Sequence, residues 1–493
     1  RADRDAWLAD VRHWRQERLL RVGFDDAEYR RLELQWAQSS FVQPQAMIED
    51  RYLYDPVAGR YTVDRYLEDL TQRYGGIDAV LLWHTYPNIG IDNRNQYDLL
   101  RDMPGGIAGV RQMVDDFHRH GVRVLFPVMM WDQGTRDEGE KNWTATAKLM
   151  AQVGADGVNG DTLEGINRKF REASDAVGHP LVLQPEGGPD DEALQWNNMT
   201  WGQFEFPWVP LVARYKWLET RHMINISDRW NRDKTDNLQF AFFNGIGWES
   251  WENVWGIWNG ITSRDAEAVR RVFKIERAMV SLLVSPEWEP YAPMLRYGVF
   301  SCKWPGKKRS LWTIVNRNQF AVSGRQLRLP YEAGVRYYDL WHGVELAPAR
   351  EGNEVVLSFA MEANGFGAVL ATGAPLDEKT SQLLSEMQEL SKAPLGSFSH
   401  EWKFLPQQLV EINPTSRTTI APEGMMRIPA ADYVLQVTGL EIEGRNEVGV
   451  DVQYPWEDSP RRHHEEVLSI PAFSIAKYPV TNAEFKRFLD ASH

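Results

Sequence analysis

Short apolar runs alternate with amphipathic segments over the first 285 residues of the chain. Residues 77–83 and 122–130 are largely apolar, as in the buried strands of a parallel sheet. Between them, residues 105–120 have apolar positions at helical spacing. This alternation predicts a (β/α)₈ TIM barrel over residues 1–285, with an N-terminal helix at residues 3–21. Further strands are expected at residues 157–159, 181–184, 223–226 and 239–243. The alternative, a doubly wound sheet, needs a glycine-rich phosphate turn after an early strand, and the sequence has none.

The pattern changes after the predicted barrel. Residues 287–372 contain short strand-like segments separated by Gly, Pro and Asn turns, which predicts an antiparallel β-sandwich without a catalytic group. Residues 373–404 contain a polar helix that is expected to link domains. Residues 405–493 are β-rich at first and end in a helix that Thr481 is expected to cap, with Glu484 three residues later.

Composition narrows the class of protein. The 493 residues carry a net charge of −14, which argues against a nucleic-acid partner because phosphate binding needs positive surface. Eighteen consecutive apolar residues occur nowhere, so no membrane span is expected. Cys302 is the single cysteine and excludes an intramolecular disulfide. Because the chain begins at Arg1 without a methionine, we expect a processed or partial chain that is secreted or periplasmic.

Tryptophan is the first indication of function. The chain has 21, and a dense group lies in one part of it. This group is Trp196, Trp201, Trp208, Trp217, Trp230, Trp248, Trp251, Trp255 and Trp258. An indole offers a flat apolar face with an N–H at its edge, which suits a sugar ring; the alternative is that these residues fill a large core.

Polar residues follow the predicted strands in several consecutive places. In a barrel the active site lies at the carboxyl ends of the strands, and a polyhydroxylated substrate needs many donors and acceptors there. The expected substrate-binding residues are His84, Asp92, Arg94, Trp131, Asp132, Arg229, Trp230, Trp248, Glu249, Trp251 and Glu252. We expect the long loop 84–98 to fold over the mouth with His84, Asp92 or Arg94 toward the cleft.

Two carboxyl groups are needed to hydrolyse a glycosidic bond, one protonated and one ionised. Asp161, flanked by glycines in DGVNGDT, is the candidate for the ionised group; alternatively it caps a turn or helix. Glu186 in QPEGG is a candidate acid, or a solvated loop residue. Asp228, beside Arg229, is an acid, a hydroxyl ligand or part of a structural ion pair. HExxH, CxxC and GxSxG motifs do not occur, and neither a metal nor a cofactor is expected.

The tryptophans near position 250 allow a more detailed expectation. Trp248, Trp251, Trp255 and Trp258 are spaced 3, 4 and 3 apart, as on one face of a helix. Trp255 and Trp258 are expected in the core. Trp248 and Trp251 are expected at the catalytic end of the barrel, where Trp248→Ala would weaken sugar binding with little loss of stability.

Residues 1–372 resemble a retaining α-glycosidase of the α-galactosidase type. The motifs that carry the resemblance are DGVNGDT (156–162) and ISDRWNRD (226–233). The resemblance implies a barrel with a C-terminal β-domain, Asp161 as nucleophile at the end of the fourth strand and Asp228 as acid/base after the sixth. Such enzymes usually have a lysine two residues before the nucleophile, where this chain has Asn159.

Residues 467–490, VLSIPAFSIAKYPVTNAEFKRFLD, resemble the entry segment of the formylglycine-generating (sulfatase-modifying factor) enzymes. GMMRIPA (424–430) resembles the opening strand of that family. The resemblance implies that residues 405–493 are part of an α+β domain of this kind. The catalytic cysteines of the family lie downstream of such a segment, whereas Cys302 lies upstream, so no catalytic residue is transferred.

The function that these patterns favour is glycoside hydrolysis of an oligosaccharide or glycan, with two carboxylates at the barrel mouth. One alternative is a carbohydrate-binding or scaffold protein with an inactive barrel. Another is a sulfatase-modifying-factor-family protein whose catalytic part lies beyond this chain.

Overall fold

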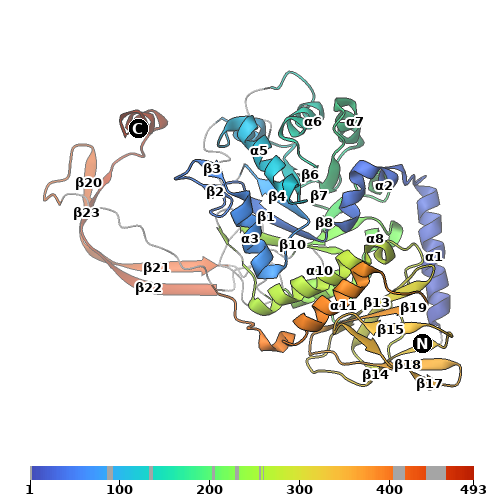
Figure 1. Ribbon diagram of the computed structural model, residues 1–493. Coiled ribbons are helices and arrows are strands. Elements are labelled where there is room, and N and C mark those ends of the chain that lie inside the picture. Colours follow the sequence, from blue (N-terminus) through green and yellow to red (C-terminus); the bar gives the residue numbers. More distant parts are fainter. Residues whose placement is uncertain are drawn as a thin grey trace. The chain divides into compact units, whose positions relative to one another are not determined.

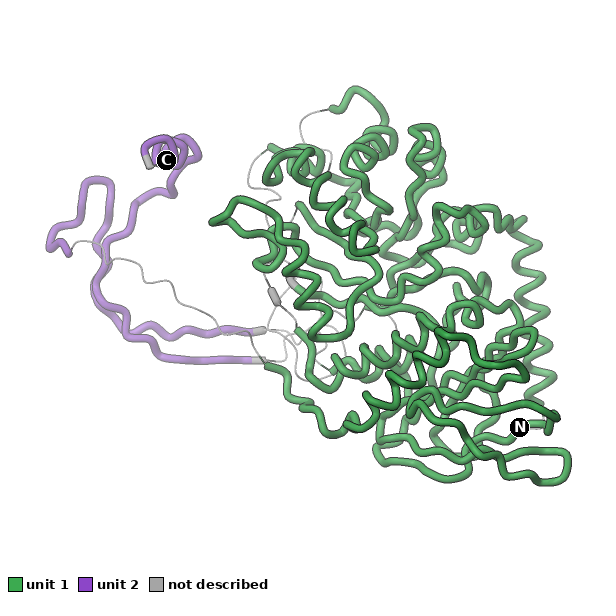
Figure 2. Tube along the Cα trace, viewed as in Figure 1, with its two compact units in different colours: residues 1–404 green, residues 405–493 purple. Residues whose placement is uncertain are grey.

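The computed structural model describes residues 3–85, 93–132, 137–202, 206–227, 233–254, 257–258, 260–403, 417–439 and 462–492. The chain divides into two compact units, Arg1–Phe404 and Leu405–His493 (Figure 2). The first unit contains a barrel and a β-domain, and the second contains two hairpin-like sheets and a helix.

Eight parallel strands form the barrel of the first unit. They are β1 (Val42–Met47), β4 (Ala79–Trp83), β5 (Arg123–Val128), β6 (Gly157–Gly160), β7 (Val182–Pro185), β8 (Met199–Gly202), β9 (Met223–Ile226) and β10 (Gly247–Val254). Their order in the sheet is β7-β6-β5-β4-β1-β10-β9-β8, so the first strand pairs with the last. β7 and β8, the two ends of this path, lie side by side. The (β/α)₈ fold class expected from the sequence is confirmed.

Helices surround the strands (Figure 1). They are α3 (Val63–Tyr74), α4 (Gln96–Arg101), α5 (Gly106–Arg119), α6 (Asn142–Val153), α7 (Arg168–Val177), η2 (Ala193–Gln195), α8 (Arg214–Leu218), α9 (Thr235–Asn244) and α10 (Ser263–Leu283). Minor strands are β2 (Tyr54–Asp55), β3 (Arg60–Tyr61) and β11 (Ile257–Trp258). α3 shows why such helices form: Val63, Leu67 and Leu70 bury one face. Gly75, with φ of 87°, ends this helix in a left-handed conformation that favours glycine.

The structure corrects the sequence-based assignment of several barrel segments. Residues 239–243 were expected to form a strand but lie in α9, because QFAFF is buried on all sides and therefore has no helical stripe. Residues 248–254 belong to strand β10 rather than to a helix. β1 and β8 were not predicted, since each is only partly apolar. The strand before ISDRW is consequently the seventh of the barrel, not the sixth.

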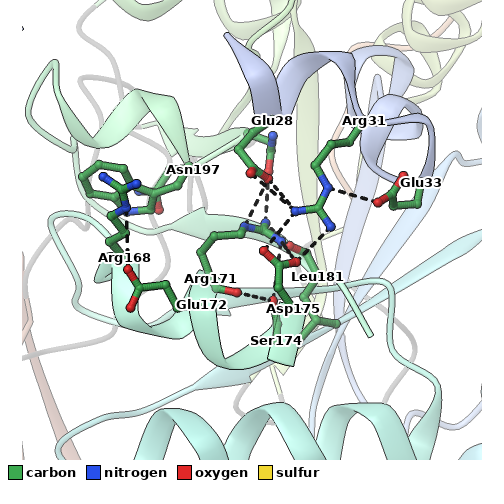
Figure 3. A network of polar contacts seen from close by, with 12 residues as sticks. Glu28, Arg31, Glu33, Arg168, Arg171, Glu172, Ser174, Asp175, Leu181 and Asn197 are labelled. Atoms are coloured by element: carbon green, nitrogen blue, oxygen red, sulfur yellow. Dashed lines mark hydrogen bonds and ion pairs between the residues drawn. The ribbon is translucent and has the colours of Figure 1, made fainter. Parts of the chain in front are cut away.

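The N-terminal segment comprises α1 (Arg4–Arg21), α2 (Ala27–Arg30) and η1 (Leu32–Ser39). Charged side chains attach it to α7 (Figure 3). Glu28 accepts from Arg31 (3.1 Å) and pairs with the buried Arg171 (3.4 Å). Arg31 also makes a bidentate pair with Asp175 at 2.9 and 3.0 Å. This network fixes the start of the chain on the outside of the barrel.

The C-terminal part of the first unit is a sandwich of two antiparallel sheets. One contains β12 (Val299–Pro305), β13 (Arg309–Asn316), β19 (Phe366–Thr372), β15 (Arg336–Asp339) and β16 (Val344–Leu346), in that order. The other contains β14 (Arg325–Pro330), β18 (Glu354–Ser358) and β17 (Ala349–Glu351). Ile314 and Val369 pack with Leu357 between the sheets. Leu311 and Leu370, on the opposite face of the larger sheet, join the barrel's core.

Residues 373–404 were expected to link domains, but their helix is part of the first unit. α11 (Glu378–Leu390) buries Leu383 and Met387 in the main core. Arg271 of α10 donates 2.7 Å bonds to the carbonyls of Leu390 and Ala393, next to η3 (Leu395–Ser397). The apolar stripe of this helix therefore packs on the barrel.

The second unit pairs β20 (Met425–Ile428) with β23 (Phe473–Ala476) and β21 (Ala431–Gly439) with β22 (Arg462–Ile470). Its helix α12 (Asn482–Ser492) begins with the expected capping box: Thr481 and Glu484 exchange bonds of 2.8 and 3.3 Å. None of its described side chains is buried. The resemblance to sulfatase-modifying factors stays a prediction. Across the described part of both units, no helix is long and apolar enough to cross a membrane.

Candidate active site

Asp161 and Glu186 follow β6 and β7, which are neighbouring strands, at their carboxyl ends. Gly160 and Pro185, the residues immediately before them, are register partners. Two residues before each acid, Asn159 donates to Gln184 inside the barrel (3.3 Å). Both acids therefore lie one residue beyond the carboxyl ends of adjacent strands. The structure brings together these two predicted catalytic residues.

The turn after β6 fixes the relation between these acids. Thr162 has φ of 59°, a left-handed conformation that is unusual for a residue other than glycine. Its backbone N–H donates to Glu186 Oε2 at 2.6 Å, so one carboxylate holds the turn beside the other. A Cβ on Gly160 would meet Ile166 and Leu163 at 2.9 Å, which explains the glycine before Asp161. Strained backbone of this kind is often found at functional sites.

Amide side chains fill the barrel below the acids. Gln43 donates to Gln184 (2.9 Å), which donates to Asn225 (3.1 Å), which in turn donates to the carbonyl of Ser40 (3.0 Å). All of these residues are buried, and Gln43 Oε1 and Asn159 Oδ1 have no partner in the described residues. Interiors of such barrels are usually packed with branched apolar side chains. These hydrogen bonds connect the inward-facing amides of several strands below the two acids.

Glu249 on β10 points into this amide network and is 1 % exposed. Gln43 donates to its Oε2 at 3.3 Å, and Gln45, with its amide nitrogen toward Oε1, donates at 2.7 Å. Burial raises the pKa of Glu249 well above its usual range, the charge of Glu186 raises it further, and the Gln43 bond opposes the shift. Burial and the neighbouring carboxyl group of Glu186 therefore both favour the uncharged form of Glu249.

Two tryptophans form a rigid wall of the mouth. Trp201 of β8 stacks on Trp251 of β10 with ring centroids 5.4 Å apart and planes inclined by 14°. The indole N–H of Trp251 donates to Ser227 Oγ at 2.8 Å. The corresponding N–H of Trp201 is buried and has no partner in the described residues. Trp251 thus lies at the catalytic end, as expected, although it stacks on another indole.

A cavity of about 510 Å³ opens between the ends of β7 and β8. Its lining consists of Thr162, Glu186, Gly187, Gly188, Thr200, Trp201, Gly202, Tyr215 and Ile224. This volume lies in the range of small-molecule sites. One of the two candidate acids, Glu186, is in its wall.

Trp248 and Glu252 are corrections to the predicted site, because both lie on the outer side of β10. Trp248 is in the main core, edge-on to Tyr74 at 6.1 Å. Glu252 accepts from Arg73 (2.7 Å), Tyr74 (3.1 Å) and Ser250 (2.8 Å). Positions 248 and 252 are even and positions 249 and 251 are odd, so their side chains point to opposite sides of the strand. Neither Trp248 nor Glu252 is therefore available to a ligand in the mouth.

Of the three residues expected to face the cleft from loop 84–98, the structure describes His84 and Arg94. His84 is buried, its ring lies edge-on to Phe126, and its Nε2 is 3.1 Å from the carbonyl of Gln96. Burial lowers the pKa of His84 to about 4, so it is neutral. Arg94 pairs with Asp102 (3.3 Å). Asp92 lies outside the described residues. His84 is therefore a packing residue.

Trp131 and Asp132 follow β5, the third barrel strand. Trp131 is 51 % exposed, as an aromatic contact residue at a cleft edge can be. Burial raises the pKa of Asp132, and its Oδ2 has no partner in the described residues. Both stay candidates for ligand binding. Asp228, Arg229 and Trp230, as well as Trp255 and the side chain of Trp258, lie outside the described residues.

Sequence analysis missed the amides of the interior and the stacking of Trp201 on Trp251. Gln43 and Gln45 occupy alternate positions of VQPQAM, which marks the inward face of a strand that has few apolar residues. Gln184 and Asn225 interrupt otherwise apolar strands in the same way. Buried amides at period two were the available signal. Within the described residues, no group of three or more His, Cys, Asp or Glu could hold a metal.

No protein-family model matches the chain, and no curated protein matches it. Among solved structures, an α-amylase from Anoxybacillus is 11 % identical, with a TM-score of 0.47 over 69 % of this chain and 99 % of that one. A debranching enzyme from Nostoc punctiforme is 12 % identical, with a TM-score of 0.45 over 68 % of this chain and 99 % of that one. A cyclomaltodextrinase is 11 % identical, with a TM-score of 0.47 over 68 % and 78 %. The barrel assignment rests on the strand order and register described above.

Proposed function

We propose that the chain is a glycoside hydrolase that acts on an oligosaccharide or glycan at the mouth of the barrel. The observation that carries the proposal is the pair Asp161 and Glu186, each one residue past the register partners Gly160 and Pro185 on adjacent parallel strands. Hydrolysis of a glycosidic bond needs such a pair of carboxyl groups. The adjacent cavity and the stacked Trp201 and Trp251 support a carbohydrate as the ligand.

In the proposed reaction Glu186 protonates the glycosidic oxygen and Asp161 attacks the anomeric carbon. Neighbouring strands lie about 4.8 Å apart. Acids on adjacent strands thus favour the shorter carboxyl separation of about 5–5.5 Å, which is typical of retention through a covalent intermediate. Glu186 is favoured over Asp228 as the acid because it follows the strand next to that of Asp161. We assign Asp228, after the seventh strand, to a further contact with substrate hydroxyls.

The test is hydrolysis of a panel of glycosides by the wild type and by Asp161→Asn. We expect the variant to lose nearly all turnover, because an amide is a poor nucleophile, while sugar binding measured by calorimetry is retained. Glu186→Gln should reduce turnover by about 10²–10⁴-fold, the usual contribution of a general acid.

Asp190→Asn is the matched control, since Asp190 is an exposed loop carboxylate that caps Ala193 N–H (2.8 Å) and an amide oxygen can replace it there. It should leave turnover unchanged. If the wild type binds sugars but hydrolyses none, the chain is a carbohydrate-binding protein with an inactive barrel. Equal turnover of wild type and Asp161→Asn would disprove the role of Asp161.

A further inference from the structure

A second cavity, of about 440 Å³, lies at the end of the barrel where the strands begin. It is lined by the end of α3 and by α10 and α11, and α10 contacts both of the other helices (Figure 1). Arg277 of α10 pairs with Asp78, directly before β4, at 2.8 Å, so the cavity lies away from the carboxyl ends of the strands. Four lining side chains are cationic, Arg270, Lys274, Arg277 and Lys379, and Glu386 is the lining carboxylate.

The negative charge of this lining already has donors. Glu386 Oε2 accepts from Lys274 (2.5 Å), and its Oε1 accepts from Gln382 (2.7 Å). Arg270 is also occupied, because it donates to Glu267 (3.1 Å) and to the carbonyl of Gln72 (2.6 Å). Both oxygens of the carboxylate are therefore taken up without a bond to either of the other two cations.

Three of the four cations keep hydrogen-bond donors that have no acceptor among the described residues. Lys274 bonds only to Glu386, and Lys379 only to the carbonyl of Arg277 (2.7 Å), so two N–H groups of each ammonium remain. Arg277 uses Nε and Nη2 on Asp78, at 2.8 and 3.0 Å, and its Nη1 has no bond in the described part of the chain. These donors belong to one cavity.

The position of Lys379 also needs an explanation. It lies in the first turn of α11, where a positive charge opposes the dipole of the helix. Its ammonium bonds to a carbonyl of α10 and forms no ion pair within the described residues. The stability of α11 therefore does not account for a cation at this place, whereas an anion bound between α10 and α11 would.

We propose that this cavity binds a small oxyanion, a phosphate or sulfate group, between α10 and α11. Lys274 and Lys379 contribute compact positive charges, and Arg277 contributes the directed donors of Nη1. A phosphate group carries a charge of about −1.5 to −2 and has three acceptor oxygens, which matches three cations with spare donors. The cavity contains neither candidate catalytic acid, so the proposal does not depend on the proposed glycosidase activity.

The test is calorimetric titration of the whole chain with inorganic phosphate, with sodium chloride added to keep the ionic strength constant. Lys379→Gln should weaken binding about three- to tenfold, the effect of one hydrogen bond. Glu386→Gln should strengthen binding about two- to fivefold, the scale of a partly exposed charge pair, because it removes the lining carboxylate and releases Lys274. Loss of folding would not produce effects of opposite sign, and circular dichroism checks each variant.

Lys148→Gln is the matched control. Lys148 is a lysine of α6 whose side chain is 52 % exposed, it pairs with Glu140 at 2.6 Å, and it is not in the lining of the cavity. Its replacement removes one positive charge from the chain, as Lys379→Gln does, and should leave the affinity for phosphate unchanged.

Titrations with sulfate and with glycerol phosphate identify the source of the anion. Tighter binding of glycerol phosphate than of inorganic phosphate would indicate an ester as the ligand, and equal or weaker binding would indicate a free anion; both results support the proposal. Binding that does not saturate below about 10 mM of any of these anions would overturn it. Equal affinity of the wild type, Lys379→Gln and Glu386→Gln would also overturn it, because the anion would then bind elsewhere.

Discussion

Each face of strand β10 carries one Glu and one Trp, but the surroundings of these side chains differ between the two faces. Glu249 and Trp251 point into the barrel, and Trp248 and Glu252 point to the helices outside. All four side chains are buried. Inside, the donors to Glu249 among the described residues are neutral amides, and burial raises its pKa. Outside, burial also opposes the charge of Glu252, but Arg73, Ser250 and Tyr74 together outweigh this effect and the pKa is lowered.

The charged and hydrogen-bonding groups around a buried carboxylate, rather than its degree of burial, thus decide its charge. A buried charge is stable only with an opposite charge or several strong donors, and Glu252 has both. Among the described residues Glu249 has two amide donors and no opposite charge, and burial raises its pKa. The outward face, by contrast, attaches the strand to α3 through Glu252, Arg73 and Tyr74.

The largest expected effect is the loss of stability in Trp248→Ala. Truncation of a large aromatic side chain in a well-packed core costs about 3–5 kcal/mol of the free energy of unfolding. This corrects the expectation that Trp248 contacts a ligand. Urea denaturation is the measurement, and Trp131→Ala, at a residue 51 % exposed, is the control with a change within about 0.5 kcal/mol. A similar loss in both variants would contradict the assignment of Trp248 to the core.

Glu252→Ala should have the second largest effect. It leaves the guanidinium of Arg73, of which 24 % is exposed, with Asp69 as its remaining partner at 2.8 Å. Breaking a buried pair by removing one member typically costs about 3–5 kcal/mol, and the remaining partner should keep the loss near 3 kcal/mol. Glu249→Gln puts a neutral amide where burial disfavours a charged carboxylate, and it should cost less than about 1 kcal/mol at pH 7. Equal losses of stability in Glu252→Ala and Glu249→Gln would contradict the proposed difference between the two faces of β10.

Much of this fold was predictable from the sequence, because parallel strands and amphipathic helices have different periods. Asp161 was proposed because glycines flank it after the short segment GVN, and Glu186 because it follows the largely apolar run LVLQ. The inward and outward faces of β10 could not be predicted, because GWESWENV has a Trp and a Glu at both even and odd positions. The Trp spacing of 3 and 4 also suggested a helix rather than a strand. Pairing with β1 decides that segment, and such long-range contacts are not visible in local pattern.

The pH dependence of stability should have opposite signs in two conservative variants. The folded-state pKa of Glu249 is raised above 4.5, so its stabilisation is full below 4.5 and is lost as pH rises toward the folded pKa. That of Glu252 is lowered, so its stabilisation is present above 4.5 and is lost as pH falls through the folded pKa. Relative to wild type, Glu249→Gln should gain stability with rising pH. Glu252→Gln should lose stability with rising pH from the acid side, by at most about 1.4 kcal/mol per pH unit. Denaturation curves from pH 3 to 9 measure both slopes.

The smallest loss of stability should come from the Arg31–Asp175 ion pair at the surface, although its geometry is better than that of the Arg73–Glu252 pair. Arg31 and Asp175 form a bidentate pair, but their side chains are 24 % and 37 % exposed, against 6 % for Glu252. Water and salt screen such a pair, and exposed pairs contribute about 0.2–1 kcal/mol. We expect Asp175→Asn to cost less than about 1 kcal/mol in urea denaturation, and the cost to shrink further in 1 M salt, where Glu252→Ala should keep most of its loss. A cost for Asp175→Asn as large as that of Glu252→Ala would mean that geometry, not burial, sets the strength of these pairs.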